Sequence, residues 1–217
     1  MQQPMPDGRF TRQLATIASV DAVGFSLLMG LDPDVAMAAF ERRSGIIVDT
    51  CRAFGGVPFG AAGDSVMAEF GLPLNALMAA LEFQNRIIEL NLGEPEAQRM
   101  SFRVGINTGD IIVRDANRYG DNVNIAARLQ ETAPENGIVI SDTTWDLIRP
   151  VSTARFCDMG ERLFKNILYP VHAYLVLGPG IGSPCPDDLS GKPAPPASAA
   201  RNDMPAAPPT VAALPSG

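Results

Sequence analysis

The chain has 217 residues, of which 46% are hydrophobic and 19% charged, as in a soluble globular domain with a substantial core. Its formal net charge of −7 argues against a general nucleic-acid surface or an anionic-membrane surface. No apolar run approaches the roughly 20 residues of a membrane helix, and no signal peptide is visible. We therefore expect a cytoplasmic protein without membrane insertion. The single His172 and three dispersed cysteines indicate no histidine-based triad, disulfide framework or zinc site.

Apolar periodicity and turn residues predict strands that alternate with long helices. In the first half of the chain we expect a strand over 13–20, a short apolar segment over 27–29, a helix from 33 to about 53, a hairpin of strands 57–59 and 65–70, and a helix over 74–92. A strand over 102–106 follows, with a turn at 109–110 into a strand over 111–113 and a helix in the 119–129 stretch. The last expected elements are a strand over 138–140, a helix capped by Ser141, and strands over 155–158 and 172–177. This alternation favours an α+β fold over a purely parallel sheet.

The two ends of the chain differ from the central part. Residues 1–11 contain two prolines and a glycine and are expected to be a loose lead-in. Residues 178–217 are rich in Pro, Ala, Gly and Ser and hold more than half of the 19 prolines. Such a segment cannot bury enough apolar surface to offset the entropy of ordering. We therefore expect one folded domain over residues 12–177, followed by a disordered tail.

Two aspartates lie at the ends of apolar segments that are expected to form strands. Asp21 follows the first strand, and Asp64 follows Gly63 in the connection of the hairpin. Each alone fits a simple role, closing a strand or serving a turn. Unpaired buried carboxylates are costly, however, and a divalent cation would offset that cost. Because Mg²⁺ is usually held by one or two carboxylates plus substrate phosphates, the pair indicates a metal site.

The helix in the 119–129 stretch has a polar face opposite its apolar face. Asn124 and Arg128 are spaced i, i+4, so their side chains project together from neighbouring turns. An amide can orient a hydroxyl group, and a guanidinium can hold two phosphate oxygens at once. The alternative is that Arg128 is a solvated helix charge and Asn124 a tolerated polar residue.

Four motifs, in this order and spacing, resemble those of the catalytic domain of class III nucleotide cyclases. They are residues 21–26 (DAVGFS), 63–65 (GDS), 102–109 (FRVGINTG) and 119–129 (YGDNVNIAARL). The similarity covers roughly residues 12–177, and within this group the chain looks most like the bacterial adenylate cyclases of rhizobia and their relatives. The resemblance implies a ferredoxin-like or palm-like antiparallel sheet flanked by helices. It also implies a head-to-tail homodimer in which each active site is shared.

The resemblance further implies which residues carry the chemistry. Asp21, Asp64 and the backbone carbonyl of Ala22 would hold two Mg²⁺ or Mn²⁺ ions per site. One ion would lower the pKa of the ribose 3′-hydroxyl group, and the other would steady the leaving pyrophosphate. Asn124 would orient the ribose, and Arg128 would stabilise charge that grows on the α-phosphate.

The expected substrate-binding positions are Phe25, Gly60, Asn117 and Lys165. Lys165 matches a lysine that contacts the triphosphate in the family, and a solvated surface lysine is the alternative. Gly60 and Asn117 depart from the family pattern, because adenylate cyclases usually read the adenine edge there with a lysine and an aspartate. Guanylate cyclases generally use a glutamate and a cysteine at these places. Asn117 can both donate and accept, so it cannot by itself exclude guanine.

The sequence therefore predicts an enzyme that converts ATP to cyclic AMP and pyrophosphate at a homodimer interface. Two alternatives stay open. One is a nucleotide-binding regulatory module of the same fold that has lost efficient catalysis. The other is a cyclase with relaxed purine choice that also uses GTP and makes cyclic GMP.

Overall fold

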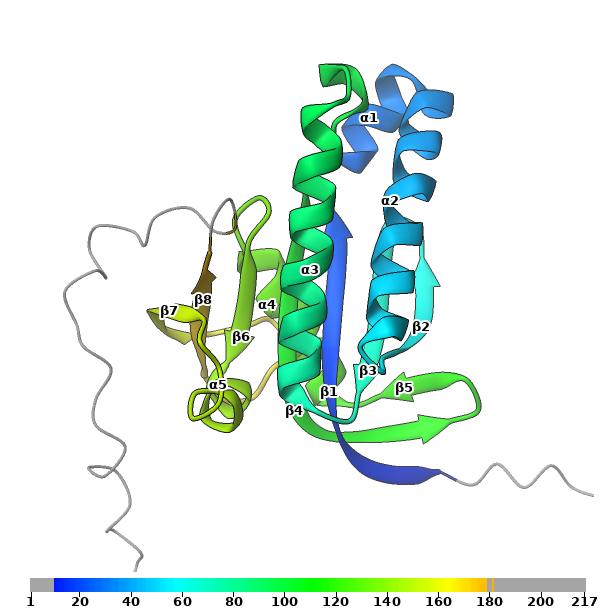
Figure 1. The fold of residues 1–217 in the computed structure, drawn as a ribbon. Helices are drawn as coiled ribbons and strands as arrows, with labels where there is room; N and C mark the ends of the chain where they lie inside the picture. Colours follow the sequence, from blue (N-terminus) through cyan, green and yellow to red (C-terminus); the bar gives the residue numbers. More distant parts are fainter. Residues whose placement is uncertain (1–9, 179–180, 182–217) are drawn as a thin grey trace, which may run out of the picture.

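A central sheet with helices on both faces organises the chain, as Figure 1 shows. The computed structural model describes residues 10–178 and residue 181. Its elements are β1 (Thr11–Ala22), α1 (Phe25–Leu31), α2 (Pro33–Ala53), β2 (Val57–Ala62), β3 (Ser65–Phe70), α3 (Pro73–Leu92), a 3-10 turn η1 (Glu96–Gln98), β4 (Phe102–Arg114), β5 (Asn117–Tyr119), α4 (Asp121–Thr132), β6 (Ile138–Ser141), α5 (Asp142–Ile148), β7 (Arg155–Arg162) and β8 (Val171–Leu177).

The strands follow the order β2-β3-β1-β4-β6-β8-β7, and β5 pairs with β4 outside this path. Every pairing is antiparallel except that of β4 with β6. The expected α+β fold with a mostly antiparallel sheet is thus confirmed.

Strand β1 is buried on both faces of the sheet. Ala18 and Val20 belong to the large core under α2 and α3, which lie side by side on one face (Figure 1). Ala15 and Ile17 belong to a smaller core under α4, on the other face. Because side chains alternate along a strand, the continuous apolar run of β1 serves both cores at once.

Two helix starts that the sequence predicts are confirmed in detail. The side chain of Asp32 accepts a hydrogen bond from the Val35 backbone N–H at 3.1 Å, and Pro33 is the first residue of α2. Ser141 likewise accepts from the Thr144 backbone N–H at the start of α5. These caps satisfy N–H groups that have no partner within the helix.

The expected turn at residues 109–110 is wrong, because β4 runs without interruption for 13 residues. Gly109 pairs with Ala15 inside the ladder. A Cβ atom at Gly109 would overlap the side chain of Asn122, so glycine is needed here for the close approach of α4. The sequence also gave no sign of β5, which has only three residues.

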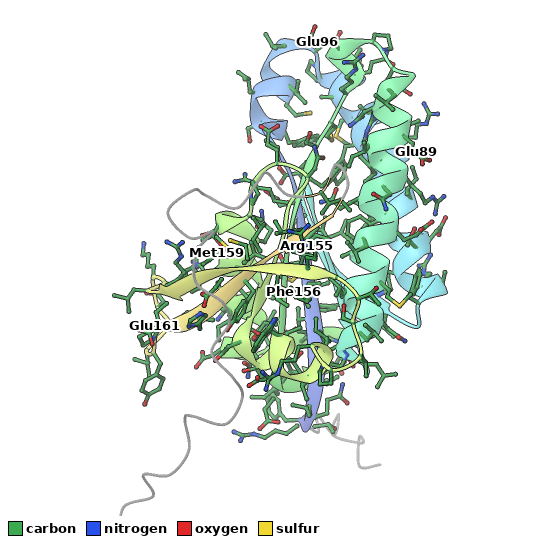
Figure 2. The ribbon with its side chains drawn as sticks, turned by 60° about the vertical axis from the view of Figure 1, so that its left-hand side comes forward. Glu89, Glu96, Arg155, Phe156, Met159 and Glu161 are labelled. Carbon is green, nitrogen blue, oxygen red and sulfur yellow. The ribbon has the colours of Figure 1, made fainter. Side chains whose placement is uncertain are left out.

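Strand β7 forms the far edge of the sheet. Figure 2 turns this edge towards the viewer, with Arg155, Phe156 and Met159 along the strand. Cys157 on β7 is disulfide-bonded, in contrast to the sequence expectation, whereas Cys51 is a buried free thiol.

The predicted lead-in and tail lie almost wholly outside the described residues. Of the tail, the structure describes Gly178 and Ile181, which pair with each other through their backbones. Within the described part of the chain, every helix is too short or too polar to cross a bilayer.

Gly105 sets the spacing between β4 and α4. A Cβ atom there would overlap the carbonyl oxygen of Ala126 and the backbone of Gln130, which cannot give way as a flexible side chain would. We expect Gly105→Ala to lower the free energy of unfolding by about 3 kcal/mol, as overpacking of a core does. Urea denaturation followed by circular dichroism measures this change.

Gly45 in α2 provides the matched control. A Cβ atom there meets nothing within 4 Å. Gly45→Ala should therefore raise the free energy of unfolding by about 0.5–1 kcal/mol, the helix preference of alanine over glycine. Equal losses for both variants would contradict the close approach at Gly105.

Candidate active site

Asp21 and Asp64 lie next to each other at one end of the sheet. Asp21 pairs with Ser65 in the β1–β3 ladder. Asp64 is the residue directly before Ser65, so it lies next to the cross-strand partner of Asp21. The backbone N–H of Ala22 donates to the carbonyl oxygen of Asp64 at 3.4 Å. Two aspartates 43 positions apart in the sequence are thus held together by strand pairing.

The environment of Asp21 is short of positive charge. Burial and the negative charge of Asp64 raise the pKa of Asp21 from 3.8 to about 6. Arg103, directly across on β4, acts in the opposite direction, and Glu131 of α4 adds to the rise. A bound cation would stabilise the ionised pair.

The carboxylate pair fits a metal that takes part of its ligands from elsewhere. Among the residues that the structure describes, no group of three or more His, Cys, Asp or Glu side chains is placed to hold a metal ion. Mg²⁺ needs only one or two carboxylates where a substrate supplies phosphate oxygens. Asp21 and Asp64, with a backbone carbonyl such as that of Ala22, meet this requirement.

Arg103 is a candidate functional residue to which the sequence analysis assigned no role. It pairs with Asp21 in the β1–β4 ladder. Its Nε atom is buried and has no hydrogen-bond partner among the described residues. Leaving a buried guanidinium N–H unpaired is unfavourable, so this position suits an anionic ligand. A charge inside an otherwise apolar strand motif was the available signal.

Helix α4 carries the predicted polar pair on its free face. Val123 and Ala126 are buried against the sheet, and Asn124 is exposed, as expected. Arg128 is partly exposed and forms an ion pair with Glu131, one turn further along the helix. In the free protomer, the guanidinium that is expected to meet a phosphate is therefore held by a carboxylate of its own helix.

The expected substrate-binding residues occupy different parts of the molecule. Phe25, at the start of α1, is partly buried and packs against Phe40 of the large core, with 5.2 Å between ring centroids. Gly60 is exposed in the hairpin with a φ of 55°, a conformation that favours glycine. Asn117 on β5 and Lys165 in the β7–β8 connection are also exposed.

Within one protomer, Lys165 and Asn117 lie at the end of the sheet away from Asp21. Strand β5 pairs with residues 112–114, at the end of β4 that is far from Asp21. The register through β6 and β8 places the 163–170 connection at this same end. At about 3.3 Å per residue, it lies about 20 Å from Asp21, beyond the reach of a lysine side chain.

Comparison with known proteins identifies the fold and the family. Residues 16–167 match the family model described as "Adenylate and Guanylate cyclase catalytic domain". The chain belongs to this cyclase family. It is 35% identical over 164 residues to the protein named "Putative adenylate cyclase 3" of Rhizobium meliloti (strain 1021). This alignment covers 75% of the chain but only 28% of that relative, so the chain spans less than a third of its length.

Solved cyclase structures share the fold. An adenylate/guanylate cyclase/hydrolase from Silicibacter pomeroyi is 30% identical, with a TM-score of 0.73 over 79% of this chain and 100% of that chain. The adenylyl cyclase CyaB from P. aeruginosa is 23% identical, with a TM-score of 0.70 over 79% of this chain and 97% of that chain. The central sheet and its helices are thus those of a cyclase catalytic domain.

In this cyclase domain, ionised Asp21 opposes folding in the absence of a cation. Its pKa of about 6 in the folded state exceeds 3.8, so the folded state binds the proton more tightly. Stability is therefore lost as the pH rises from about 4 to about 6. The metal-free Asp21→Asn variant should melt about 2–5 °C above the wild type at pH 8, and by a smaller margin at pH 5.

Thermal unfolding in the presence of a chelator measures this difference. Glu41→Gln, on the exposed face of α2, removes one charge elsewhere and serves as the control. A melting temperature of Asp21→Asn below that of the wild type at pH 8 would mean that the ionised carboxylate is already stabilised within the protein.

Proposed function

We propose that the chain converts a purine nucleoside triphosphate, in the first place ATP, to the 3′,5′-cyclic monophosphate and pyrophosphate. The observation that carries this proposal is the placement of Asp21 and Asp64 side by side, with Arg103 across from Asp21. Carboxylates suit divalent cations, and a guanidinium suits phosphate oxygens. The name of the rhizobial relative, "Putative adenylate cyclase 3", supports ATP as the substrate.

The reaction joins two atoms of the same nucleotide. The ribose 3′-oxygen forms a bond to the α-phosphorus, the bond from the α-phosphorus to the β-phosphate oxygen breaks, and the hydroxyl proton is released. Two Mg²⁺ or Mn²⁺ ions held by Asp21, Asp64 and the Ala22 carbonyl would activate the hydroxyl group and neutralise the leaving pyrophosphate. Asn124 orients the ribose, and Arg128 stabilises the charge that develops on the α-phosphate.

We further propose that two chains assemble each site. The metal aspartates lie at one end of the sheet, whereas Lys165 and Asn117 lie at the other. A two-fold arrangement with the chains side by side and antiparallel brings opposite ends together, and it creates two identical sites. Arg128 then exchanges its partner Glu131 for a phosphate of the nucleotide bound by the other chain's aspartates.

Replacement of Asp64 tests the metal assignment. Asp64→Ala should lower the turnover of ATP at saturating Mn²⁺ by at least about a hundredfold, because several kcal/mol of charge stabilisation are lost. The fold should persist, since Asp64 lies at the end of a hairpin and only partly buried. Product formation followed by chromatography, together with a thermal melt, measures both effects.

Glu82→Ala, on the exposed face of α3, is the control and should leave the turnover unchanged. Near-normal turnover of Asp64→Ala would refute the two-metal assignment. Loss of folding instead would favour a structural role for this carboxylate.

Mixing of inactive variants tests the shared site. Asp64→Ala and Arg128→Ala homodimers should both be nearly inactive. In a mixed dimer, one site collects both defects and the other collects neither. With random exchange half of the dimers are mixed, so activity should recover to about a quarter of the wild-type value.

A mixture of Asp21→Ala with Asp64→Ala is the matched control. Both substitutions affect the metal half, so neither site of a mixed dimer is intact and no activity should return. If the Asp64→Ala and Arg128→Ala mixture also stays inactive despite demonstrated subunit exchange, Arg128 acts on the metals of its own chain.

A further inference from the structure

Arg118 on β5 is held in place by contacts with two other strands, through Glu69 on β3 and Phe59 on β2. Its Nε atom donates to the Glu69 carboxylate at 2.5 Å, and its Nη1 atom donates to the Ala116 carbonyl oxygen at 2.8 Å. The guanidinium carbon lies 5.2 Å from the centroid of the Phe59 ring. Only 13% of the Arg118 side chain and 15% of the Glu69 side chain are exposed. The guanidinium is therefore held in place and largely shielded from water.

In the cluster of Arg118, Glu69, Gln13 and Phe59, both carboxylate oxygens of Glu69 have a hydrogen-bond partner, whereas some N–H groups of Arg118 have none among the described residues. One carboxylate oxygen of Glu69 accepts from Gln13 and the other accepts from Arg118. A guanidinium has five N–H groups, and the bonds to Glu69 and Ala116 use two of them. Within the described part of the chain, Nη2 makes no further hydrogen bond. The cluster thus presents an oriented donor.

Arg118 lies on the face of the sheet that carries α4. Glu69 pairs with Ile17, which belongs to the core under α4, so both side chains point to that face. Phe59, which the guanidinium covers, also packs against this core. The donor of Arg118 is therefore on the same side of the sheet as Asn124 and Arg128.

The direction of α4 places the base of a bound nucleotide near this donor, an argument that rests on the function proposed above. The helix starts after β5 and ends near Asp21, whose pKa responds to Glu131. With the α-phosphate at Arg128 and the ribose at Asn124, one turn earlier, the base continues towards the start of α4. There the same chain presents β5, which carries Asn117 and Arg118.

The donor chemistry of Arg118 matches guanine better than adenine. Guanine presents two adjacent acceptors, O6 and N7, whereas adenine presents N7 beside an amino group that is itself a donor. We propose that Arg118 donates to O6 of a guanine base, so that GTP is a second substrate of this site and cyclic GMP a second product. Glu69 is a positioning residue that holds the guanidinium in place.

The test compares kcat/KM for ATP, GTP and ITP in the presence of Mn²⁺. ITP keeps O6 and N7 but lacks the 2-amino group, so it should behave like GTP. For Arg118→Gln, the ratio of kcat/KM for GTP to that for ATP should fall at least about tenfold, and the ratio for ITP to ATP should fall with it. For Arg118→Lys, the ratio of kcat/KM for GTP to that for ATP should lie between the values of the wild type and of Arg118→Gln, because an ammonium group lacks the planar N–H pair of a guanidinium.

Arg114→Gln is the matched control on the same hairpin. Its guanidinium lies over Phe10, 5.1 Å from the ring centroid, away from Glu69. This variant should keep the wild-type ratio of GTP to ATP. Thermal melts of all variants show whether the substitution has destabilised the β4–β5 hairpin.

Several results would overturn the role of Arg118. They are a wild type that converts ATP but not GTP, an unchanged ratio in Arg118→Gln, and equal losses for both nucleotides in Arg118→Gln and Glu69→Gln. The last result would mean that the ion pair of Arg118 with Glu69 has only a structural role, holding β5 against β3. Each of these leaves the cyclase proposal intact.

A wild type that forms no cyclic product from any nucleotide would instead refute the proposed function. In that case, displacement of a fluorescent nucleotide by GTP and by ATP measures the binding preference of the site without turnover, and so tests the role of Arg118. A tenfold loss of the preference for GTP in Arg118→Gln supports guanine recognition, and an unchanged preference overturns it.

Discussion

Two carboxylates held together with too little positive charge nearby determine the character of one end of this domain. Strand pairing fixes Asp21 opposite Ser65, and the hydrogen bond from Ala22 fixes the backbone of Asp64. The pair cannot separate without breaking the β1–β3 ladder. The cores on both faces of β1 offset the repulsion of the pair, and a cation bound between the carboxylates would stabilise the fold further. Arg103, across the sheet, is placed to meet an anion that arrives with such a cation.

The close approach of α4 to β4 holds the second group of candidate residues in place. Gly105 and Gly109 leave no room for a side chain between strand and helix. Asn107, buried in β4, donates to both the carbonyl oxygen and the side-chain oxygen of Asn122 at 3.0 Å. Asn122 in turn donates to the Asp110 carbonyl oxygen. The first turn of α4 is therefore tied to the sheet, and the polar pair that follows is carried on a rigid support.

Local signals in the sequence predicted the elements, and long-range contacts account for what was missed. The N-cap at Asp32 and the apolar run of β1 act over a few residues, so their consequences can be read directly from the chain. The 109–110 turn was wrong because the reason for Gly109, the side chain of Asn122, comes from another element. The roles expected for the aspartates and for α4 came from family motifs. Arg103 and Arg118 escaped notice because their partners lie two or more strands away in the sequence.

Strand β4 spans the full height of the sheet. Arg103 stands near its first residue, across from Asp21, and its last residues hold β5. In the proposed two-fold dimer, each β4 therefore has one end in each of the two sites. Strand β4 pairs with β1 along residues 102–113, which fixes the distance between its two ends. In such a dimer, the same strand would therefore support the metal-binding residues of one site and the β5 residues of the other.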